Sequence, residues 1–131
     1  SNFDTNNAEV HKATYFESAL LLNHNNQFTF TALPNTTQVA PTNGILVLDT
    51  DGNGSDEIIT VGNHYPVEVE TGRYDAHIGS VMTNDFKAIS LEKSGFFNNK
   101  DARDIDLITI KGKKHLMVSN NREAVAFFRI N

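Results

Sequence analysis

Residues 45–61 read ILVLDTDGNGSDEIITV and place oxygen-bearing side chains at alternate positions between two short apolar segments. Both flanks are rich in β-branched residues, which favour a β-strand on either side of the polar centre. Gly52 and Gly54 permit the backbone angles that a tight curl requires. The stretch therefore predicts a β-hairpin whose turn gathers several oxygens.

Such a turn suits a hard cation, because Ca2+ takes about six to eight oxygen ligands from a chain that folds back on itself. The turn is shorter than the loop of an EF-hand, and no helix is expected beside it. An ordinary polar turn is the alternative, since Asp-Gly and Asn-Gly are common in hairpins. The alternating donors favour one structural Ca2+ site, whose predicted ligands are the side chains of Asp49, Asp51, Asn53 and Glu57 and the backbone carbonyl of Ser55.

Composition narrows the class of protein. The chain has 131 residues, of which 39% are hydrophobic and 21% charged, as in one globular domain. It has no cysteine, which excludes disulfides, cysteine–zinc sites and thiol catalysis. The formal net charge of −5 argues against nucleic acid as a partner. No apolar run is long enough to predict a membrane span.

Short apolar stretches separated by Gly, Asn and Asp predict an all-β, antiparallel fold. Residues 1–13 are polar and rich in Asn, which is typical of a flexible lead-in. The Pro-containing stretch at 34–43 and the stretch at 92–104 are expected to be connectors. The predicted strands are residues 15–22, 27–33, 45–49, 57–61, 77–82, 86–91, 105–110, 115–119 and 124–130.

Internal repetition suggests how these strands are organised. ALLLNHNNQFTFTAL at 19–33 is similar to GSVMTNDFKAISL at 79–91, and a connector and an apolar hairpin follow each. An inner hairpin followed by an outer hairpin is the construction of a four-stranded propeller blade. We therefore expect about two to two and a half propeller-type blades in one segment, 14–131. It would comprise outer strands at 14–34, a complete blade at 44–92 and a partial blade at 104–131.

The chain resembles the FG-GAP/VCBS-type repeats of integrin-like β-propellers. Six motifs carry the resemblance: FTFTALP at 28–34, QVAP at 38–41, LDTDGNGSDEIITVGN at 48–63, GRYDAHIG at 72–79, KSGFF at 93–97 and RDIDLI at 103–108. The resemblance implies the same five metal ligands. Asn53 and Glu57 depart from the Asp residues of the family pattern, so we expect weaker binding. The turn at 111–114 is basic, so one site is expected.

The resemblance also implies a setting and a role. We expect the C-terminal segment of a large secreted, periplasmic or cell-surface bacterial protein. Its role would be non-enzymatic, presenting a surface for adhesion to a protein or glycan ligand. Because a closed propeller needs about four blades, we expect apolar faces that are covered by neighbouring blades of a parent chain or by self-association.

A second polar cluster follows the calcium hairpin, in a long segment expected to be irregular. Such a segment is a candidate binding rim, formed by His64, Tyr65, Glu68, Glu70, Arg73, Tyr74 and Asp75. We expect Arg73 and Asp75 to lock the segment by charge-assisted hydrogen bonds. The alternative is an accessory or catalytic domain of a polysaccharide-processing enzyme, with the two glutamates as acid and base. The five histidines lack metal-ligand spacing and are expected at the surface or in turns.

Overall fold

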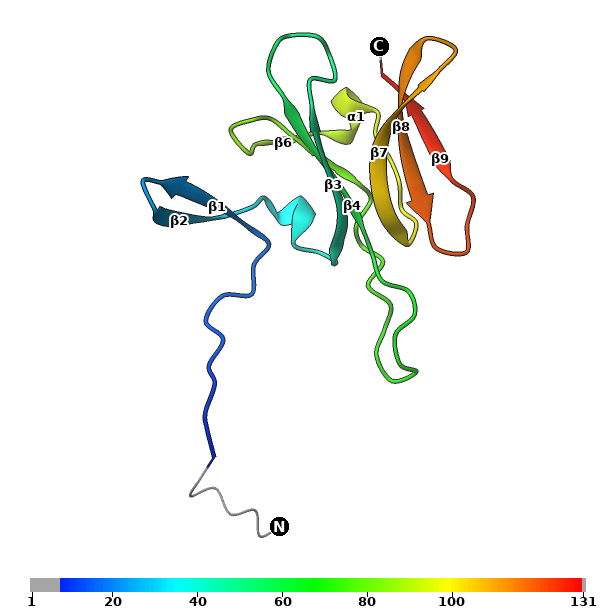
Figure 1. The fold of residues 1–131 in the computed structure, drawn as a ribbon. Helices are drawn as coiled ribbons and strands as arrows, with labels where there is room; N and C mark the ends of the chain where they lie inside the picture. The colour runs from blue at the N-terminus through cyan, green and yellow to red at the C-terminus, as the bar shows by residue number, and fades with distance from the viewer. Residues whose placement is uncertain (1–7, 131) are drawn as a thin grey trace.

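The computed structural model describes residues 8–130. They form an all-β structure of antiparallel sheets, none of which closes into a barrel (Figure 1). The predicted all-β, antiparallel class is thus confirmed, whereas its division into propeller blades stays a prediction. The lead-in predicted at 1–13 lies partly outside the described residues, and residues 8–13 have no regular secondary structure.

The first sheet is an isolated hairpin of β1 (Ala19–His24) and β2 (Gln27–Ala32). Its turn residues Asn25 and Asn26 both have positive φ, 52° and 66°, which is the backbone of a type I′ hairpin turn. Neither strand has a fully buried residue, although both are rich in Leu and Phe. In Figure 1 the hairpin projects away from the other sheets.

The second sheet contains four strands in chain order, and we call it the four-stranded sheet. Its strands are β3 (Thr42–Leu48), β4 (Glu57–Gly62), β5 (Ser80–Met82) and β6 (Ala88–Ile89). Strand β3 starts earlier than predicted, and β5 and β6 are shorter than the predicted 77–82 and 86–91. The apolar stretches that predicted them extend beyond the residues that pair along the ladder.

The third sheet, which we call the three-stranded sheet, consists of β7 (Ala102–Ile110), β8 (Lys113–Asn120) and β9 (Ala126–Arg129). Lys111 and Gly112 form its first turn with φ values of 49° and 76°. This turn is the tight, solvent-exposed hairpin turn that the Lys-Gly-Lys sequence predicts.

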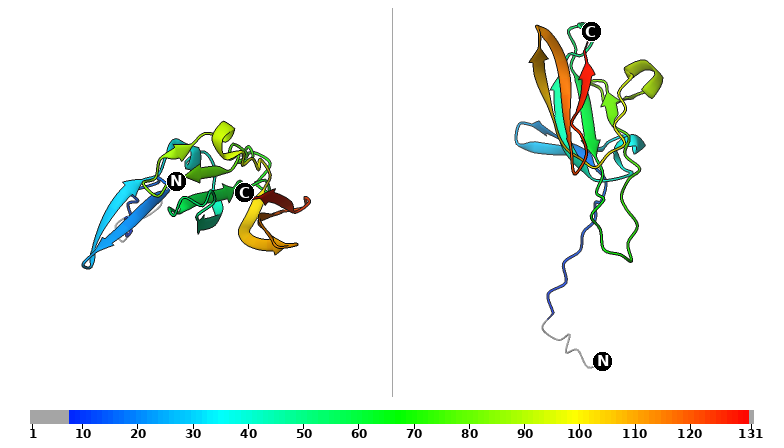
Figure 2. Two further views of the ribbon diagram at one scale, coloured as in Figure 1. Left: turned by 90° about the horizontal axis from the view of Figure 1, so that it is seen from above. Right: turned by 90° about the vertical axis from the view of Figure 1, so that its right-hand side faces the viewer.

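The hydrophobic core lies between the four-stranded and three-stranded sheets. Ile59 and Val61 on β4 pack with Ile105 on β7 and Val118 on β8. Phe96, which is 5% exposed, fills the gap beside them and packs on Phe128 with a ring-centroid distance of 4.7 Å. Figure 2 shows the two sheets side by side, with the β1–β2 hairpin on the other side of the four-stranded sheet.

Close approach of the two sheets depends on Gly44 of β3. A Cβ atom there would lie 2.9 Å from the backbone nitrogen of Ile105 and 2.9 Å from a methyl carbon of Val61. Contacts this short do not occur between real side chains, so the missing side chain lets β3 and β7 approach.

Two short helical segments replace parts of the predicted connectors. The 3-10 helix η1 (Asn35–Thr37) lies in the connector before β3, and α1 (Leu91–Ser94) lies in the one before β7. Gly95 ends α1 with a φ of 63°, the left-handed conformation that glycine adopts readily at this position. In the described part of the chain no helix is long and apolar enough to cross a membrane.

His77 corrects a prediction, because it is fully buried rather than placed at the surface. The backbone N–H of Gly79 donates to its Nδ1 at 3.0 Å, and Nε2 lies 3.3 Å from the hydroxyl of Thr60. Burial lowers the pKa of His77 below its ordinary value of 6.5, because the charged imidazolium would lose its hydration. His77 is therefore neutral at pH 7 and part of the core.

Candidate functional site

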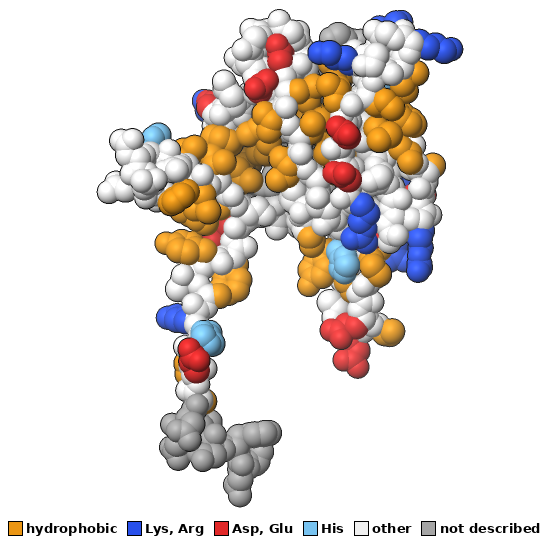
Figure 3. Space-filling model, in the orientation of Figure 1, with side chains coloured by type: hydrophobic (Ala, Val, Ile, Leu, Met, Phe, Trp, Pro, Cys, Tyr) orange, Lys and Arg blue, Asp and Glu red, His pale blue; other side chains and the backbone are white. Residues whose placement is uncertain are grey.

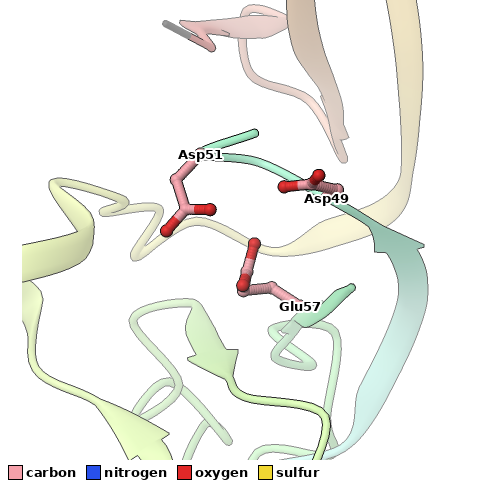
Figure 4. Close-up of side chains that lie close together, drawn as sticks. All are labelled: Asp49, Asp51 and Glu57. Atoms are coloured by element: carbon pink, nitrogen blue, oxygen red, sulfur yellow. The ribbon is translucent and has the colours of Figure 1, made fainter. Parts of the chain in front are cut away.

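Three of the predicted metal ligands lie close together in the turn between β3 and β4. Asp49 and Asp51 follow the end of β3, and Glu57 is the first residue of β4. Each offers one carboxylate oxygen, and these oxygens lie within 4.8 Å of one another. Figure 4 shows the three side chains around a common space.

This spacing fits a calcium ion. Oxygens bound to one Ca2+ lie about 2.3–2.6 Å from it, so two ligand oxygens are at most about 5 Å apart. The separation of 4.8 Å or less lies within that limit. The donor set is also suitable, because carboxylates are preferred ligands of hard cations.

Asp49 organises the turn. Its Oδ1 accepts hydrogen bonds from the backbone N–H groups of Gly52 at 2.7 Å and Asn53 at 3.2 Å, and its Oδ2 accepts one from Gly54 at 2.9 Å. The bond from Gly54 is the main reason that the pKa of Asp49 lies below its ordinary value of 3.8. Asp49 is therefore charged at neutral pH. Because each carboxylate oxygen can accept two bonds, Oδ2 keeps a lone pair for a metal.

Glu57 is a buried carboxylate, 5% exposed. Its Oε2 accepts hydrogen bonds from the backbone N–H and the hydroxyl of Thr50, at 2.9 and 2.5 Å. Among residues 8–130, its Oε1 accepts no hydrogen bond, and no Lys or Arg forms an ion pair with Glu57, Asp49 or Asp51. Three neighbouring carboxylates thus lie together without an ion pair to Lys or Arg, a charge arrangement that a divalent ion would neutralise.

The remaining two predicted ligands, Asn53 and Ser55, are exposed in the same turn. The side-chain oxygen of Asn53 accepts a hydrogen bond from the backbone N–H of Ser55 at 2.7 Å, and Oδ1 of Asp51 accepts one from Asn53 at 3.1 Å. These bonds belong to the polar-turn alternative as well, because they give the turn its shape without an ion. The carboxylate cluster, rather than the turn geometry, is therefore what favours a metal.

The carboxylate cluster lies at the mouth of a cleft between the four-stranded and three-stranded sheets. Asp51 and Glu57 line this cleft, whose volume is about 590 Å3. Lys93 and Arg129 also line it, and its apolar floor is formed by Ile59, Val81, Phe96 and Leu116. The candidate metal centre thus joins the turn of one sheet to the gap between both sheets.

The predicted binding rim is a projecting loop, residues 63–76, which extends beyond the sheets in Figure 1. His64 and Tyr74 close its base through two backbone hydrogen bonds of 2.8 and 3.1 Å. Asn63 anchors the base from below. Its side chain donates to the carbonyls of His77 at 2.7 Å and Lys100 at 3.0 Å, and accepts from the N–H of His77 at 2.9 Å.

Arg73 stacks on Tyr65, with its guanidinium carbon 5.2 Å from the ring centroid. Within residues 8–130, the side chains of Arg73 and Asp75 make no hydrogen bond and no ion pair, so the predicted lock by charge-assisted hydrogen bonds is wrong. The Tyr65 hydroxyl donates to the carbonyl of Asn99 at 2.7 Å, which ties the loop to the segment before β7. The contacts of the loop seen here are thus the stacking of Arg73 on Tyr65 and the hydrogen bond of Tyr65 to Asn99.

A small hollow of about 260 Å3 lies between the base of the projecting loop and the turn after β8. Tyr65, Pro66 and Arg73 contribute to it from the loop, and Asp101, Asn121, Arg122 and Glu123 from the other side. Sequence analysis did not identify Asp101, a fully buried carboxylate that accepts a 2.8 Å bond from Arg103. It lies far from the loop in sequence, and no local pattern marks it.

The loop's two glutamates do not line this hollow. Glu68 and Glu70 are exposed, and Glu68 accepts a hydrogen bond from the hydroxyl of Thr71 at 2.8 Å. Acidic side chains gather at the tip of the loop in Figure 3. The predicted rim is therefore divided, with the two glutamates at its tip and with the aromatic and cationic residues, together with Asp75 next to Tyr74, toward its base.

Comparison of the chain with protein-family models, with curated proteins and with solved structures found no match. The resemblance to FG-GAP/VCBS-type repeats therefore stays a prediction.

Proposed function

We propose that this chain is a non-enzymatic β-sheet repeat segment in which one calcium ion, held at the β3–β4 turn, stabilises the contact between two sheets. The convergence of carboxylate oxygens of Asp49, Asp51 and Glu57 within 4.8 Å, with no ion pair to Lys or Arg among residues 8–130, carries the proposal. Bound calcium would neutralise the three carboxylates and tie both ends of the turn together. The ion's role is structural, and no reaction step depends on it.

We further propose that the two larger sheets are propeller-type blades. The consecutive order β3-β4-β5-β6, the similar hairpin β7-β8 and the face-to-face packing of the two sheets support this arrangement. The sequence resemblance suggests an extracellular setting, where millimolar calcium would fill a weak site. There the exposed surfaces would bind a protein or glycan ligand in adhesion.

The hydrolytic alternative has no specific observation in its favour. Glu68 and Glu70 are exposed at the tip of the loop, and neither lines the hollow at its base. A general acid usually depends on a sheltered environment that raises its pKa. We therefore propose binding rather than catalysis for this surface.

Thermal melting in calcium or in chelator tests the proposed metal. If the dissociation constant is about 0.1 mM, 10 mM calcium stabilises the native state by about 2.7 kcal/mol. For a domain of this size, that raises the melting temperature by roughly 10 °C. The double variant Asp49→Ala/Asp51→Ala should lose the shift, whereas Glu68→Ala/Glu70→Ala, which removes two carboxylates elsewhere, should keep it. Equal shifts in both variants would show that calcium acts elsewhere.

A further inference from the structure

The packing of the two larger sheets leaves apolar side chains exposed on the outer face of each of them. On the four-stranded sheet, the side away from β7–β9 exposes Ile45 by 63% and Val47 by 56%. We call it the front face, and Ile45, Val47 and Ile58 share it in the β3–β4 register. The part of this face beyond them is already covered, because Thr60, Ser80 and Met82 are buried there. On the three-stranded sheet, the side away from the core is the back face, where Ile108, Ile110, Met117 and Phe127 are interspersed with the polar residues Asp106, Lys113, His115 and Arg129.

These open faces correspond to the two halves of the internal contact. Leu48, the last residue of β3, points to the core and pairs with the first residue of β4. Ile110, the last residue of β7, has the same place in its hairpin but lies on the back face. The back face of the three-stranded sheet is thus equivalent to the core-facing side of the four-stranded sheet. In the same way, the front face of the four-stranded sheet is equivalent to the core-facing side of the three-stranded sheet.

We propose that a second copy of this chain packs its back face on the front face of the first. This contact continues the existing interface between the sheets, because it repeats the same pairing of faces between molecules. Each copy keeps one unused face of each kind, so the contact is head-to-tail. Such heterologous contacts close into rings or extend into filaments.

The β1–β2 hairpin marks the place that the second copy would fill. It lies on the side of the four-stranded sheet opposite to β7–β9 (Figures 1 and 2). Gln38 fixes its base, accepting a bond from the N–H of Ser18 at 2.7 Å and donating to the carbonyls of Ser18 and Leu33 at 2.8 and 2.9 Å. An isolated two-stranded hairpin is marginally stable in water. The second copy would cover its exposed Leu21 and Phe28, which are 63% and 66% exposed.

The test is sedimentation equilibrium, combined with charge substitutions that block one face at a time. Wild-type protein should associate as its concentration rises, with or without calcium. Val47→Lys blocks the front face and Phe127→Lys the back face, since a lysine at a packed apolar contact loses hydration without a partner. Each variant alone should weaken association at least tenfold. Val69→Lys is the matched control, because Val69 is 103% exposed on the projecting loop and belongs to neither face.

Mixing the two variants decides whether the contact is head-to-tail. The Phe127→Lys variant keeps an unaltered front face, and the Val47→Lys variant keeps an unaltered back face. An equimolar mixture of the two should therefore form a heterodimer and nothing larger. Circular dichroism checks that each variant is folded, and Ile45→Lys with Ile110→Lys provides a second pair. A wild type that stays monomeric at about 1 mM, a mixture that stays monomeric, or weakening by only one variant of a pair would overturn the proposal. Dependence on calcium would not be expected, so a failed metal proposal leaves this result intact.

Discussion

Asn63 offers a quantitative test of how the projecting loop is attached. Its fully buried side chain makes three hydrogen bonds, two with the backbone of His77 and one with the carbonyl of Lys100. Asn63→Gly removes all three and leaves backbone groups buried without partners. An unsatisfied buried group costs about 1–3 kcal/mol, so with the two groups of His77 counted, the substitution should destabilise the protein by about 3 kcal/mol.

The backbone of Asn63 adds a second component that can be separated from the first. Its φ is 87°, a left-handed value that an alanine adopts only with strain of about 1–2 kcal/mol. Alanine also stiffens the unfolded chain, which offsets part of that strain. We therefore expect the Asn63→Ala variant to be no more stable than the Asn63→Gly variant. At a position with ordinary backbone angles, the alanine variant would be the more stable of the two.

Urea unfolding measures both effects, with Asn99→Gly as the control. Asn99 is exposed and its side chain makes no hydrogen bond within residues 8–130, so the control reports the general effect of a new glycine. The midpoint should fall in the Asn63 variants with little change in the slope. Equal losses for Asn63→Gly and Asn99→Gly would refute the view that this buried amide anchors the loop.

Two further predictions concern the core. Because the pKa of His77 is lowered in the folded protein, the unfolded chain takes up the imidazole proton at a higher pH than the folded protein does. The contribution of His77 to the free energy of unfolding should therefore be complete above pH 6.5. It should decline as the pH falls below 6.5, by at most about 1.4 kcal/mol per pH unit. In chemical unfolding across pH 5–7, His77→Gln should flatten this decline, and an unchanged slope would contradict the assignment. Gly44→Ala should cost about 1–3 kcal/mol in thermal melting because its Cβ meets the backbone of β7. Gly72→Ala, with open space around it, should be nearly neutral, and equal effects would count against the close packing of the sheets.

The hairpins were the most predictable part of the fold. Asn-Asn and Lys-Gly between alternating or apolar segments are local turn signals, and the structure places residues 25–26 and 111–112 in the positive-φ turns that they require. Strand ends were less predictable. His77 falls in a predicted strand, but its side chain is held by Thr60 and its backbone by Asn63, so regular pairing starts only at Ser80.

The candidate functional residues likewise include some that the sequence predicted and some that it did not. Asp49, Asp51 and Glu57 lie within nine residues of one another, and a tight turn must bring them together, so their sequence spacing predicted the cluster. Asp101 and Asn121 reach the hollow beside Tyr65 through the packing of β7 and β8 against the loop. Contacts of that kind depend on tertiary structure and leave no periodic or spaced pattern in the chain.

Isothermal titration of the chelator-treated protein with calcium tests the central claim most directly. We predict one equivalent of bound calcium for the wild type, with a dissociation constant of about 0.1–1 mM. Asp51→Asn, which removes one charge from the turn at nearly constant size, should weaken that binding at least tenfold, while Glu70→Gln leaves it unchanged. No heat of binding at saturating calcium, or equal binding by the wild type and Asp51→Asn, would contradict a metal centre at the β3–β4 turn.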